Sequence, residues 1–361
     1  MYSYQTDSLL NLIKNLFLMQ SAAKRGLNLL FVNPNIPNKR FEEKIISLLQ
    51  NYPEITFQTV SHPDYTEFST IKNKDLIEAV VLANDRSSID VIMKECKGLR
   101  WCHNFVTGCE RILSSENFVN SGITLTTARG ASAQALAEYT IGAMLYFSRR
   151  YREWDRLKDE NTWGALYASD ISRKKVAIVG YGKIGAKIGC ICKLCFEMEI
   201  LGVKRTRNEA SAKFNPEVSE FFGLDKLGDA CEAADFIVNV LPKTKETQDI
   251  FNEKVFERFK KTAVFINIGR GMNVVEADLI KALKANKFSG AALDVFVEEP
   301  LPKHSPFYTD EELKKKVLIS CHSANKSESL IEGVLECLKE NIEAYLDGKP
   351  LIGIVEKDAE Y

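Results

Sequence analysis

A glycine-rich run near the middle of the chain has the residue types and the spacing that bind a pyrophosphate. Gly180, Gly182 and Gly185 follow the short apolar stretch 176–179, and a helical pattern continues over 186–196. The first glycine permits a tight turn, the second lets backbone N–H groups approach the phosphates, and the third lets the helix pack closely on the strand. The helix N-terminus adds positive potential. This context predicts a dinucleotide site made by Gly180, Tyr181, Gly182, Lys183, Ile184 and Gly185.

A basic cluster follows the next predicted strand, 199–203, where NAD-binding sheets place an Asp or Glu that accepts from the ribose 2′-OH. This chain has Lys204, Arg205, Thr206 and Arg207 there. The three cations cannot accept a hydrogen bond from the ribose diol as a carboxylate does, but together with the hydroxyl they can hold a 2′-phosphate. We therefore expect NADP(H) to be preferred. The alternative is a solvated basic turn with NAD(H) bound.

Four downstream segments resemble those of the D-isomer-specific 2-hydroxyacid dehydrogenases. Residues 235–247 are similar to the family's cofactor-lining strand and turn, and 266–271 to the strand that carries its catalytic arginine. Residues 291–301 are similar to the segment with the acidic partner, and 319–324 to the catalytic-histidine segment. The segments have the family's order and spacing, and the resemblance extends over roughly residues 78–354.

The resemblance implies a catalytic set of Arg270, Glu299 and His322, and each residue type suits the reduction of a 2-oxo acid. A hydride would pass from nicotinamide C4 to substrate C2, and a proton must reach the oxygen. An imidazole titrates near neutral pH, so His322 is the expected acid in reduction and base in oxidation. A neighbouring carboxylate, expected from Glu299, favours the protonated ring and orients it. The planar guanidinium of Arg270 suits the substrate carboxylate and carbonyl.

The resemblance also indicates which residues line the cofactor and the substrate. Asp294 is expected to contact the nicotinamide carboxamide. The backbone amides of a loop over Val106, Thr107 and Gly108 are expected to bind the substrate carboxylate together with Arg270. The remaining positions expected beside the cofactor are Val240, Leu241, Pro242, Thr247, Ile268, Gly269 and Ala324.

Two α/β units are needed to position these residues. Apolar runs separated by helical patterns indicate a first parallel sheet. Its strands are expected at 28–32, 55–60, 79–82, 99–105 and 123–126. A second unit begins abruptly at Lys175. One long helix is expected over Ala131–Tyr151, which is apolar and lacks proline, and a last helix over Glu328–Leu346.

The predicted fold class is α/β, with two Rossmann-like, doubly wound parallel-sheet domains. A chain of 361 residues exceeds one ordinary core. The dinucleotide-binding domain is expected at 127–326, inserted into a discontinuous flavodoxin-like substrate domain made of 1–126 and 327–361. Residues 1–26 are expected to be an N-terminal helical extension. The active cleft should then lie between the two domains.

Composition and charge argue against several other classes of protein. Lys and Arg total 48 against 49 for Asp and Glu, so no general attraction to nucleic acid or to an anionic membrane is expected. No apolar run reaches the ~18 residues that span a bilayer. The nine cysteines are odd in number, and the pair Cys192 and Cys195 lacks the partner pair of a zinc site. We expect no metal, reduced and mostly buried thiols, and a cytoplasmic location.

The function expected from these features is NAD(P)H-dependent reduction of a small 2-oxo acid to a D-2-hydroxy acid. The family resemblance favours glyoxylate or hydroxypyruvate, and it implies a homodimer that the long helix helps to form. The enzyme alternative is an NAD-linked D-lactate or D-3-phosphoglycerate dehydrogenase. An alternative of another class is a dinucleotide-regulated, corepressor-like interaction protein. The other histidines, His62, His103 and His304, are interpreted as structural.

Overall fold

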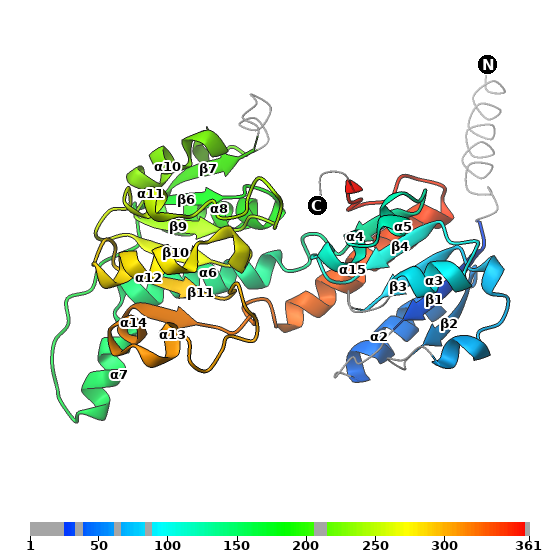
Figure 1. Cartoon of the computed structure of the whole chain (residues 1–361), viewed down its shortest axis with the longest axis horizontal. Coiled ribbons are helices and arrows are strands. Elements are labelled where there is room, and N and C mark those ends of the chain that lie inside the picture. Colours follow the sequence, from blue (N-terminus) through cyan, green and yellow to red (C-terminus); the bar gives the residue numbers. More distant parts are fainter. Residues whose placement is uncertain (1–24, 33–38, 61–65, 84–88, 206–214, 358–361) are drawn as a thin grey trace, which may run out of the picture. The chain divides into compact units, whose positions relative to one another are not determined.

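The computed structural model describes residues 25–32, 39–60, 66–83, 89–205 and 215–357 (Figure 1). The chain divides into two compact units. Unit 1 takes the residues up to 128 and those from 334 to 358, and unit 2 takes 129–333. The expected N-terminal extension lies almost wholly outside the described residues.

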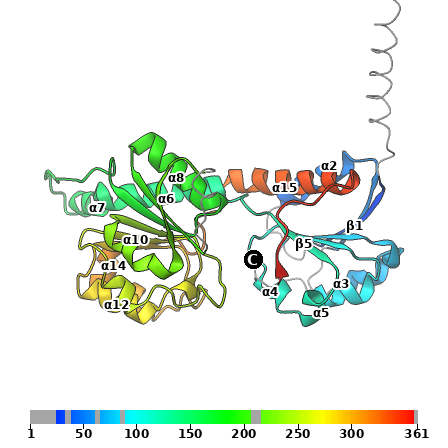
Figure 2. The same cartoon turned by 90° about the horizontal axis from the view of Figure 1, so that it is seen from above.

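Unit 1 is built on a five-stranded parallel sheet. Its strands are β1 (Leu27–Val32), β2 (Ile55–Val60), β3 (Ala79–Leu82), β4 (Trp101–Asn104) and β5 (Thr124–Thr127). Their order is β2-β1-β3-β4-β5, the flavodoxin-like order. Helices α2 (Lys39–Gln50) and α15 (Glu328–Leu346) cover one face, and α3 (Ile89–Glu95), α4 (Glu110–Leu113) and α5 (Glu116–Val119) cover the other (Figure 2). The five strands expected from the sequence are present, with β4 shorter than expected.

Unit 2 is built on a seven-stranded parallel sheet. Its strands are β6 (Lys175–Val179), β7 (Glu199–Lys204), β8 (Val218–Gly223), β9 (Phe236–Asn239), β10 (Val264–Asn267), β11 (Gly290–Leu293) and β12 (Val317–Ile319). The order β12-β11-β10-β9-β6-β7-β8 is that of a dinucleotide-binding sheet. It reverses between β9 and β6, and such folds bind ligands beyond the carboxyl ends of the strands at that point. The two parallel sheets confirm the predicted fold class.

Helices cover both faces of the second sheet (Figure 2). One face carries α6 (Ala133–Ser148) and α8 (Lys183–Phe196), and the other carries α10 (Leu227–Ala233), α11 (Glu253–Phe256), α12 (Glu276–Lys284), α13 (Pro306–Thr309) and α14 (Glu311–Lys316). Successive side chains of β6 alternate between the two layers. Val176 and Ile178 pack with Leu136 and Ile188 on the first face, and Ala177 and Val179 pack on the second. Burial on both faces explains why these strands read as continuous apolar runs.

The long helix predicted over Ala131–Tyr151 is present as α6, but it ends earlier than predicted. Helix α6 ends at Ser148 and α7 (Tyr151–Asp159) begins after a reversal at Arg150, whose φ is 57°. A residue in this left-handed conformation commonly ends a helix, usually as glycine. Helix α6 packs against the sheet, whereas α7 has no fully buried residue. The helix therefore stops where its apolar support ends, and no Gly or Pro marks that point.

Strand β8 was not predicted. Its sequence Val218-Ser219-Glu220-Phe221-Phe222-Gly223 mixes polar and aromatic residues, and it lies at the edge of the sheet beside β7. An edge strand is covered less completely than a central one and needs no continuous apolar run. Its pairing with β7 is nevertheless extensive, from Ile200 opposite Val218 to Lys204 opposite Gly223.

The nine cysteines, all within the described residues, form no disulfide. Burial raises the pKa of Cys96 to about 11 and that of Cys192 to about 12. These two thiols therefore stay protonated, and unreactive, at neutral pH. None of the helices in the described ranges is both long enough and apolar enough to cross a membrane.

Two helical glycines should respond oppositely to replacement by alanine. In α15, a Cβ at Gly333 would lie 2.7 Å from the carbonyl oxygen of Ala131 and 2.9 Å from its Cα. In α6, a Cβ at Gly142 would meet nothing within 4 Å. We predict that Gly142→Ala raises the free energy of unfolding by up to about 1 kcal/mol, through helix propensity. Gly333→Ala should lower it by about 1–3 kcal/mol, because the backbone clash outweighs the propensity gain.

Thermal and urea unfolding of the two variants beside the wild-type protein measure both effects. Equal shifts in the same direction would contradict the close approach of α15 to Ala131.

Candidate active site

The glycine-rich loop connects β6 to α8 in a form that fits a pyrophosphate. Gly180 has φ 101°, and a Cβ there would lie 3.0 Å from the carbonyl carbon of Val240. A Cβ at Gly185 would lie 2.6 Å from the carbonyl oxygen of Gly180, so α8 packs tightly on the loop. A Cβ at Gly182 would meet nothing within 4 Å, which leaves open space at the helix N-terminus. The backbone N–H groups that begin α8 can therefore receive a phosphate.

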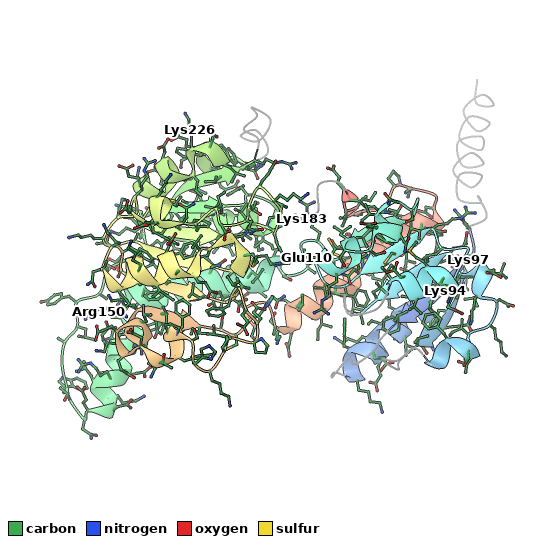
Figure 3. All side chains as sticks on the ribbon, viewed as in Figure 1. Lys94, Lys97, Glu110, Arg150, Lys183 and Lys226 are labelled. Carbon is green, nitrogen blue, oxygen red and sulfur yellow. The ribbon has the colours of Figure 1, made fainter. Side chains whose placement is uncertain are left out.

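Lys183 and Tyr181 turn in different directions from this loop. The ammonium of Lys183 lies 3.3 Å from the carbonyl oxygen of Arg129 at the surface (Figure 3). The Tyr181 ring is 4% exposed, and its phenol donates to Glu217 Oε1 at 2.6 Å. Burial and this carboxylate raise the pKa of Tyr181, which stays a donor. The Tyr181 side chain thus packs inside unit 2, and its backbone is the part that belongs to the loop.

The predicted basic cluster begins at the carboxyl end of β7. The Lys204 ammonium lies 5.0 Å from the ring centroid of Phe221 and 5.9 Å from that of Tyr181, within cation–π range. Arg205 follows and is exposed. Thr206 and Arg207 lie outside the described residues.

Three buried asparagines connect the ends of the central strands. Asn239 ends β9 and Asn267 ends β10, and the Nδ2 group of Asn239 donates to the Oδ1 atoms of Asn267 and Asn273 at 2.9 and 3.0 Å. All three side chains are at most 1% exposed. Their oxygens also accept from the backbone beyond the strands, Asn239 from Leu241 N–H at 3.1 Å and Asn267 from Gly269 N–H at 3.2 Å. The network fixes the two turns expected to line the cofactor.

Asn273 extends this network to the remaining parts of the site. Its Nδ2 group donates to the carbonyl oxygens of Pro242 and Thr247 at 3.1 and 3.0 Å, and its Oδ1 accepts from Arg270 N–H at 3.1 Å. Thr247 Oγ1 also donates to the Pro242 carbonyl at 2.7 Å. One buried amide therefore links the turn after β9 to the backbone of Arg270.

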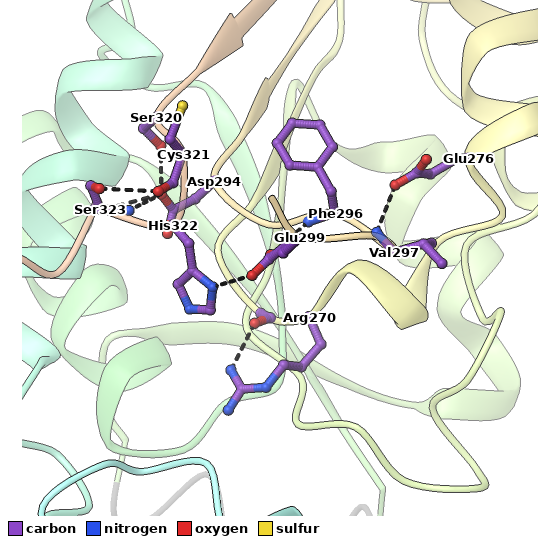
Figure 4. A network of polar contacts seen from close by, with 12 residues as sticks. Arg270, Glu276, Asp294, Phe296, Val297, Glu299, Ser320, Cys321, His322 and Ser323 are labelled. Atoms are coloured by element: carbon purple, nitrogen blue, oxygen red, sulfur yellow. Dashed lines mark hydrogen bonds and ion pairs between the residues drawn. The ribbon is translucent and has the colours of Figure 1, made fainter. Parts of the chain in front are cut away.

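A close backbone contact brings Arg270 beside the loop of Glu299. Arg270 precedes the 3-10 turn η4 (Gly271–Asn273), and its Nη1 donates to the carbonyl oxygen of Gly269 at 2.9 Å. A Cβ at Gly271 would lie 1.9 Å from the carbonyl carbon of Phe296, so only glycine permits this approach. Figure 4 shows Arg270 and Glu299 in the same small region.

His322 and Glu299 form a direct pair. The Nδ1 atom of His322 lies 2.7 Å from Glu299 Oε2, and the other oxygen of Glu299 accepts from Phe296 N–H at 3.0 Å (Figure 4). The two side chains are 50% and 34% exposed, so the pair is accessible. Because Nδ1 faces the carboxylate, Nε2 is the nitrogen that can exchange a proton with a substrate.

Asp294 follows β11 and is 3% exposed. Its Oδ1 accepts from Ser323 N–H at 2.8 Å and from Ala324 N–H at 3.0 Å. The predicted cofactor contacts Asp294 and Ala324 are thus bonded to each other, and both belong to the support of the His322 turn. Val240 and Ala324 are half-buried, and Leu241 and Ile268 are buried.

The predicted substrate loop belongs to unit 1, whereas every other described site residue belongs to unit 2. Val106 and Thr107 are exposed and Gly108 is buried. Asn104, at the end of β4, donates from Nδ2 to the carbonyl oxygens of Val106 and Gly108 at 2.8 and 3.0 Å. This buried amide shapes the loop.

The remaining histidines lie in different surroundings. His103 is fully buried, with Nδ1 2.8 Å from Thr126 Oγ1, and burial lowers its pKa to about 3, so it stays neutral. His304 is exposed on the loop before α13. His62 lies outside the described residues.

The supporting asparagines were not predicted from the sequence. Asn104, Asn239 and Asn267 are each the last residue of an otherwise largely apolar parallel strand. A buried amide at a carboxyl strand end, where α/β folds bind ligands, is a signal that could have identified all three. Asn273 has no such signal, because its partners are distant in sequence.

Within unit 2 the arrangement combines an oriented imidazole, a carboxylate and a guanidinium with a loop that fits a pyrophosphate. Such a set can hold a small anion through Arg270 and exchange a proton through His322. The described residues contain no cluster of His, Cys, Asp and Glu suited to a metal ion.

Comparison with known proteins finds relatives in both sequence and structure. The family model "D-isomer specific 2-hydroxyacid dehydrogenase, NAD binding domain" matches residues 141–324. A glyoxylate reductase of Pyrococcus horikoshii is 31% identical over 294 residues, which cover 77% of this chain and 82% of that protein. A glyoxylate/hydroxypyruvate reductase A of Citrobacter koseri is 34% identical over 173 residues, 48% of this chain and about half (54%) of that protein.

Solved structures show the same fold. A D-isomer specific 2-hydroxyacid dehydrogenase from Xanthobacter autotrophicus, crystallised with NADPH and MES, superposes with a TM-score of 0.78 at 21% identity. The superposition covers 94% of this chain and all of that one (100%). The family match and the relatives confirm the resemblance found in the sequence: the chain belongs to the D-isomer specific 2-hydroxyacid dehydrogenase family of NAD(P)-binding oxidoreductases.

Proposed function

We propose that the protein reduces a small 2-oxo acid to the D-2-hydroxy acid, with NADPH preferred over NADH. The observation that carries this proposal is the accessible His322–Glu299 pair at 2.7 Å, beside Arg270 and in the same unit as the dinucleotide loop. Acid–base and anion-binding groups beside a hydride carrier are what reduction of a 2-oxo acid requires.

Each protein group has one task in this reaction. When the cofactor is bound, its nicotinamide supplies the hydride. His322 donates a proton from Nε2 to the oxygen that becomes the hydroxyl, and Glu299 stabilises the positive ring through Nδ1. Arg270 keeps its charge throughout and binds the substrate carboxylate and carbonyl in a planar fork. The backbone of Val106–Gly108 supplies further donors to the carboxylate.

Glyoxylate and hydroxypyruvate are the substrates we propose, on the names of the Pyrococcus and Citrobacter relatives. A first test is a panel of 2-oxo acids assayed with NADPH and NADH in parallel. Turnover of glyoxylate or hydroxypyruvate supports the proposal. If no 2-oxo acid is reduced with either nucleotide, the proposal fails, and a dinucleotide-regulated interaction protein becomes the better explanation.

The preference for NADPH is supported by the end of β7. Lys204 carries a positive charge there, held over two aromatic rings, and Arg205 adds a second. NAD-binding sheets have an Asp or Glu at this position, and its carboxylate accepts a hydrogen bond from the ribose 2′-OH. This chain has Lys204 there instead. We assign 2′-phosphate binding to Lys204, Arg205, Thr206 and Arg207.

Self-association into a homodimer is supported by the arm that follows α6, which consists of α7 and residues 160–174. Trp163 and Tyr167 are fully exposed, and Tyr151 and Trp154 on α7 are each 41% exposed. The part of the arm after α7 runs along the outside of unit 2 as an extended loop (Figure 1). Large exposed aromatic side chains within one segment of a monomer are typical of an interaction surface. We propose that a second copy of the chain covers them.

A reducing compartment such as the cytoplasm is our proposed location. It is supported by the nine cysteines, which form no disulfide although all lie in described residues. Proteins of oxidising compartments commonly pair such thiols.

Replacing His322 tests the chemistry. We predict that His322→Ala lowers kcat for glyoxylate reduction by about 100-fold to 10,000-fold, because the proton donor is lost. The Kd for NADPH, measured by fluorescence titration, should stay unchanged. His304→Ala, which removes an exposed histidine outside the site, is the control. A wild-type kcat in His322→Ala would exclude the imidazole from the mechanism.

Replacing the first two cations tests the nucleotide preference. In Lys204→Ala/Arg205→Ala we expect the KM for NADPH to rise by about 10-fold to 100-fold, as for the loss of charge-assisted hydrogen bonds. The KM for NADH should change little. Lys193→Ala removes an exposed lysine from the last turn of α8, which precedes the start of β7 and so lies at the opposite end of that strand from Lys204, and it serves as the control. Equal changes for both nucleotides would refute binding of the 2′-phosphate.

The dimer has its own test. We predict that Trp163→Ser/Tyr167→Ser raises the dimer dissociation constant by at least about 10-fold, because exposed aromatics provide most of the energy at interfaces. Light scattering across a dilution series measures the mass. Leu194→Ser, which removes a 76% exposed apolar side chain from α8, is the control. A monomeric wild-type protein, or an unchanged double variant, would contradict the proposed surface.

A further inference from the structure

The turn that carries His322 is backbone-strained. Cys321 has φ 53° and His322 has φ 50°, so two successive residues with side chains occupy the left-handed region. Such conformations are unfavourable for L-residues and persist only where surrounding contacts impose them. The pair His322–Glu299 joins two side chains and does not by itself fix this backbone. Another set of contacts must hold the turn.

Asp294 supplies those contacts from the carboxyl end of β11. Its carbonyl oxygen accepts from His322 N–H at 2.6 Å, and its Oδ1 accepts from Ser323 N–H at 2.8 Å and Ala324 N–H at 3.0 Å. One residue therefore binds three consecutive backbone N–H groups of the turn. Its side chain is 3% exposed, where unbonded polar groups are costly.

Ser320 and Tyr139 continue this contact into the core of unit 2. Ser320 Oγ lies 2.6 Å from Asp294 Oδ1 and 2.9 Å from the phenol oxygen of Tyr139, a residue of α6 that is 181 positions away in the sequence. A serine hydroxyl has one hydrogen to donate. The shorter contact with the carboxylate takes it, so the Tyr139 O–H donates to Ser320 Oγ. Burial raises the pKa of Tyr139 to about 12, which keeps it a donor.

We propose that Tyr139, Ser320 and Asp294 form a hydrogen-bonded relay that holds the His322 turn in its left-handed conformation and so aims the imidazole at Glu299. Tyr139 and Ser320 are positioning residues in this relay, since they act through Asp294. The relay joins one helix and two strand ends, α6, β11 and β12, and its direction runs from phenol to hydroxyl to carboxylate. Figure 4 shows Ser320, Asp294 and Ser323 gathered on the side of the turn away from Glu299.

The effect of the relay on catalysis rests on the proposed function. Its effect on the structure of the His322 turn can be tested without measuring turnover. In Ser320→Ala, Asp294 loses a donor and Tyr139 loses its acceptor. We expect hydrogen–deuterium exchange of the peptide containing Ser323 and Ala324 to become faster by about 10-fold or more, since two N–H groups lose a well-ordered acceptor. Tyr139→Phe, which removes the end of the relay, should give a smaller increase.

The kinetic readout separates positioning from general instability. We expect kcat to fall by about 10-fold to 100-fold in Ser320→Ala, as for a misplaced catalytic group, and by about 2-fold to 10-fold in Tyr139→Phe, as for one neutral hydrogen bond. The Kd for NADPH should stay unchanged in both. Ser320→Thr keeps the hydroxyl and should restore most of the rate.

A matched control comes from the same helix. Tyr146→Phe removes a second phenol from α6, two turns beyond Tyr139, and should leave both exchange and kcat unchanged. Wild-type exchange and wild-type kcat in Ser320→Ala would overturn the relay. So would an equal loss in Ser320→Thr and Ser320→Ala. Faster exchange in Ser320→Ala with no turnover by the wild-type protein would leave the relay supported and refute the proposed function instead.

Discussion

Parallel strands impose one constraint on which the whole site depends: the backbone groups just beyond their carboxyl ends have no neighbouring strand to bond. In unit 2 the three adjacent strands β9, β10 and β11 meet this need with Asn239, Asn267 and Asp294, each buried at or just beyond its strand end. These side chains bond the turns that carry the predicted cofactor and catalytic residues. Satisfying buried backbone groups and building the site are therefore the same structural task.

The supporting and the reacting residues differ in exposure. Asn239, Asn267 and Asp294 are at most 3% exposed, whereas the side chains of His322 and Glu299 are 50% and 34% exposed. Burial strengthens hydrogen bonds and fixes side-chain orientation, so support belongs inside the unit. A proton donor must reach its substrate, so it belongs at the surface of the unit. The strained backbone of Cys321 and His322 lies at the boundary between the buried supporting residues and the exposed reacting residues.

Much of this could be predicted from the sequence because it is encoded locally. The strands of unit 1 were predicted from apolar runs, and the glycine loop from its context between a strand and a helix. The break at Arg150 and edge strand β8 could not be predicted in this way. Both features depend on how far the folded sheet extends beside the segment. That extent is a property of the assembled layers of strands and helices. The three strand-end asparagines were visible in the sequence but carry meaning only once burial is known.

The sequence by itself determined the α/β class, the family, and the identities of Arg270, Glu299 and His322 as candidates, because periodicity and motif spacing are properties of neighbouring residues. Only the tertiary structure decided that His322 presents Nδ1 to Glu299, that Gly271 brings Arg270 against the loop of Phe296, and that Tyr139 supports a turn 181 positions away. The physical reason is that these contacts join residues from different strands and helices. Their distances follow from strand order and helix packing, which local spacing does not specify.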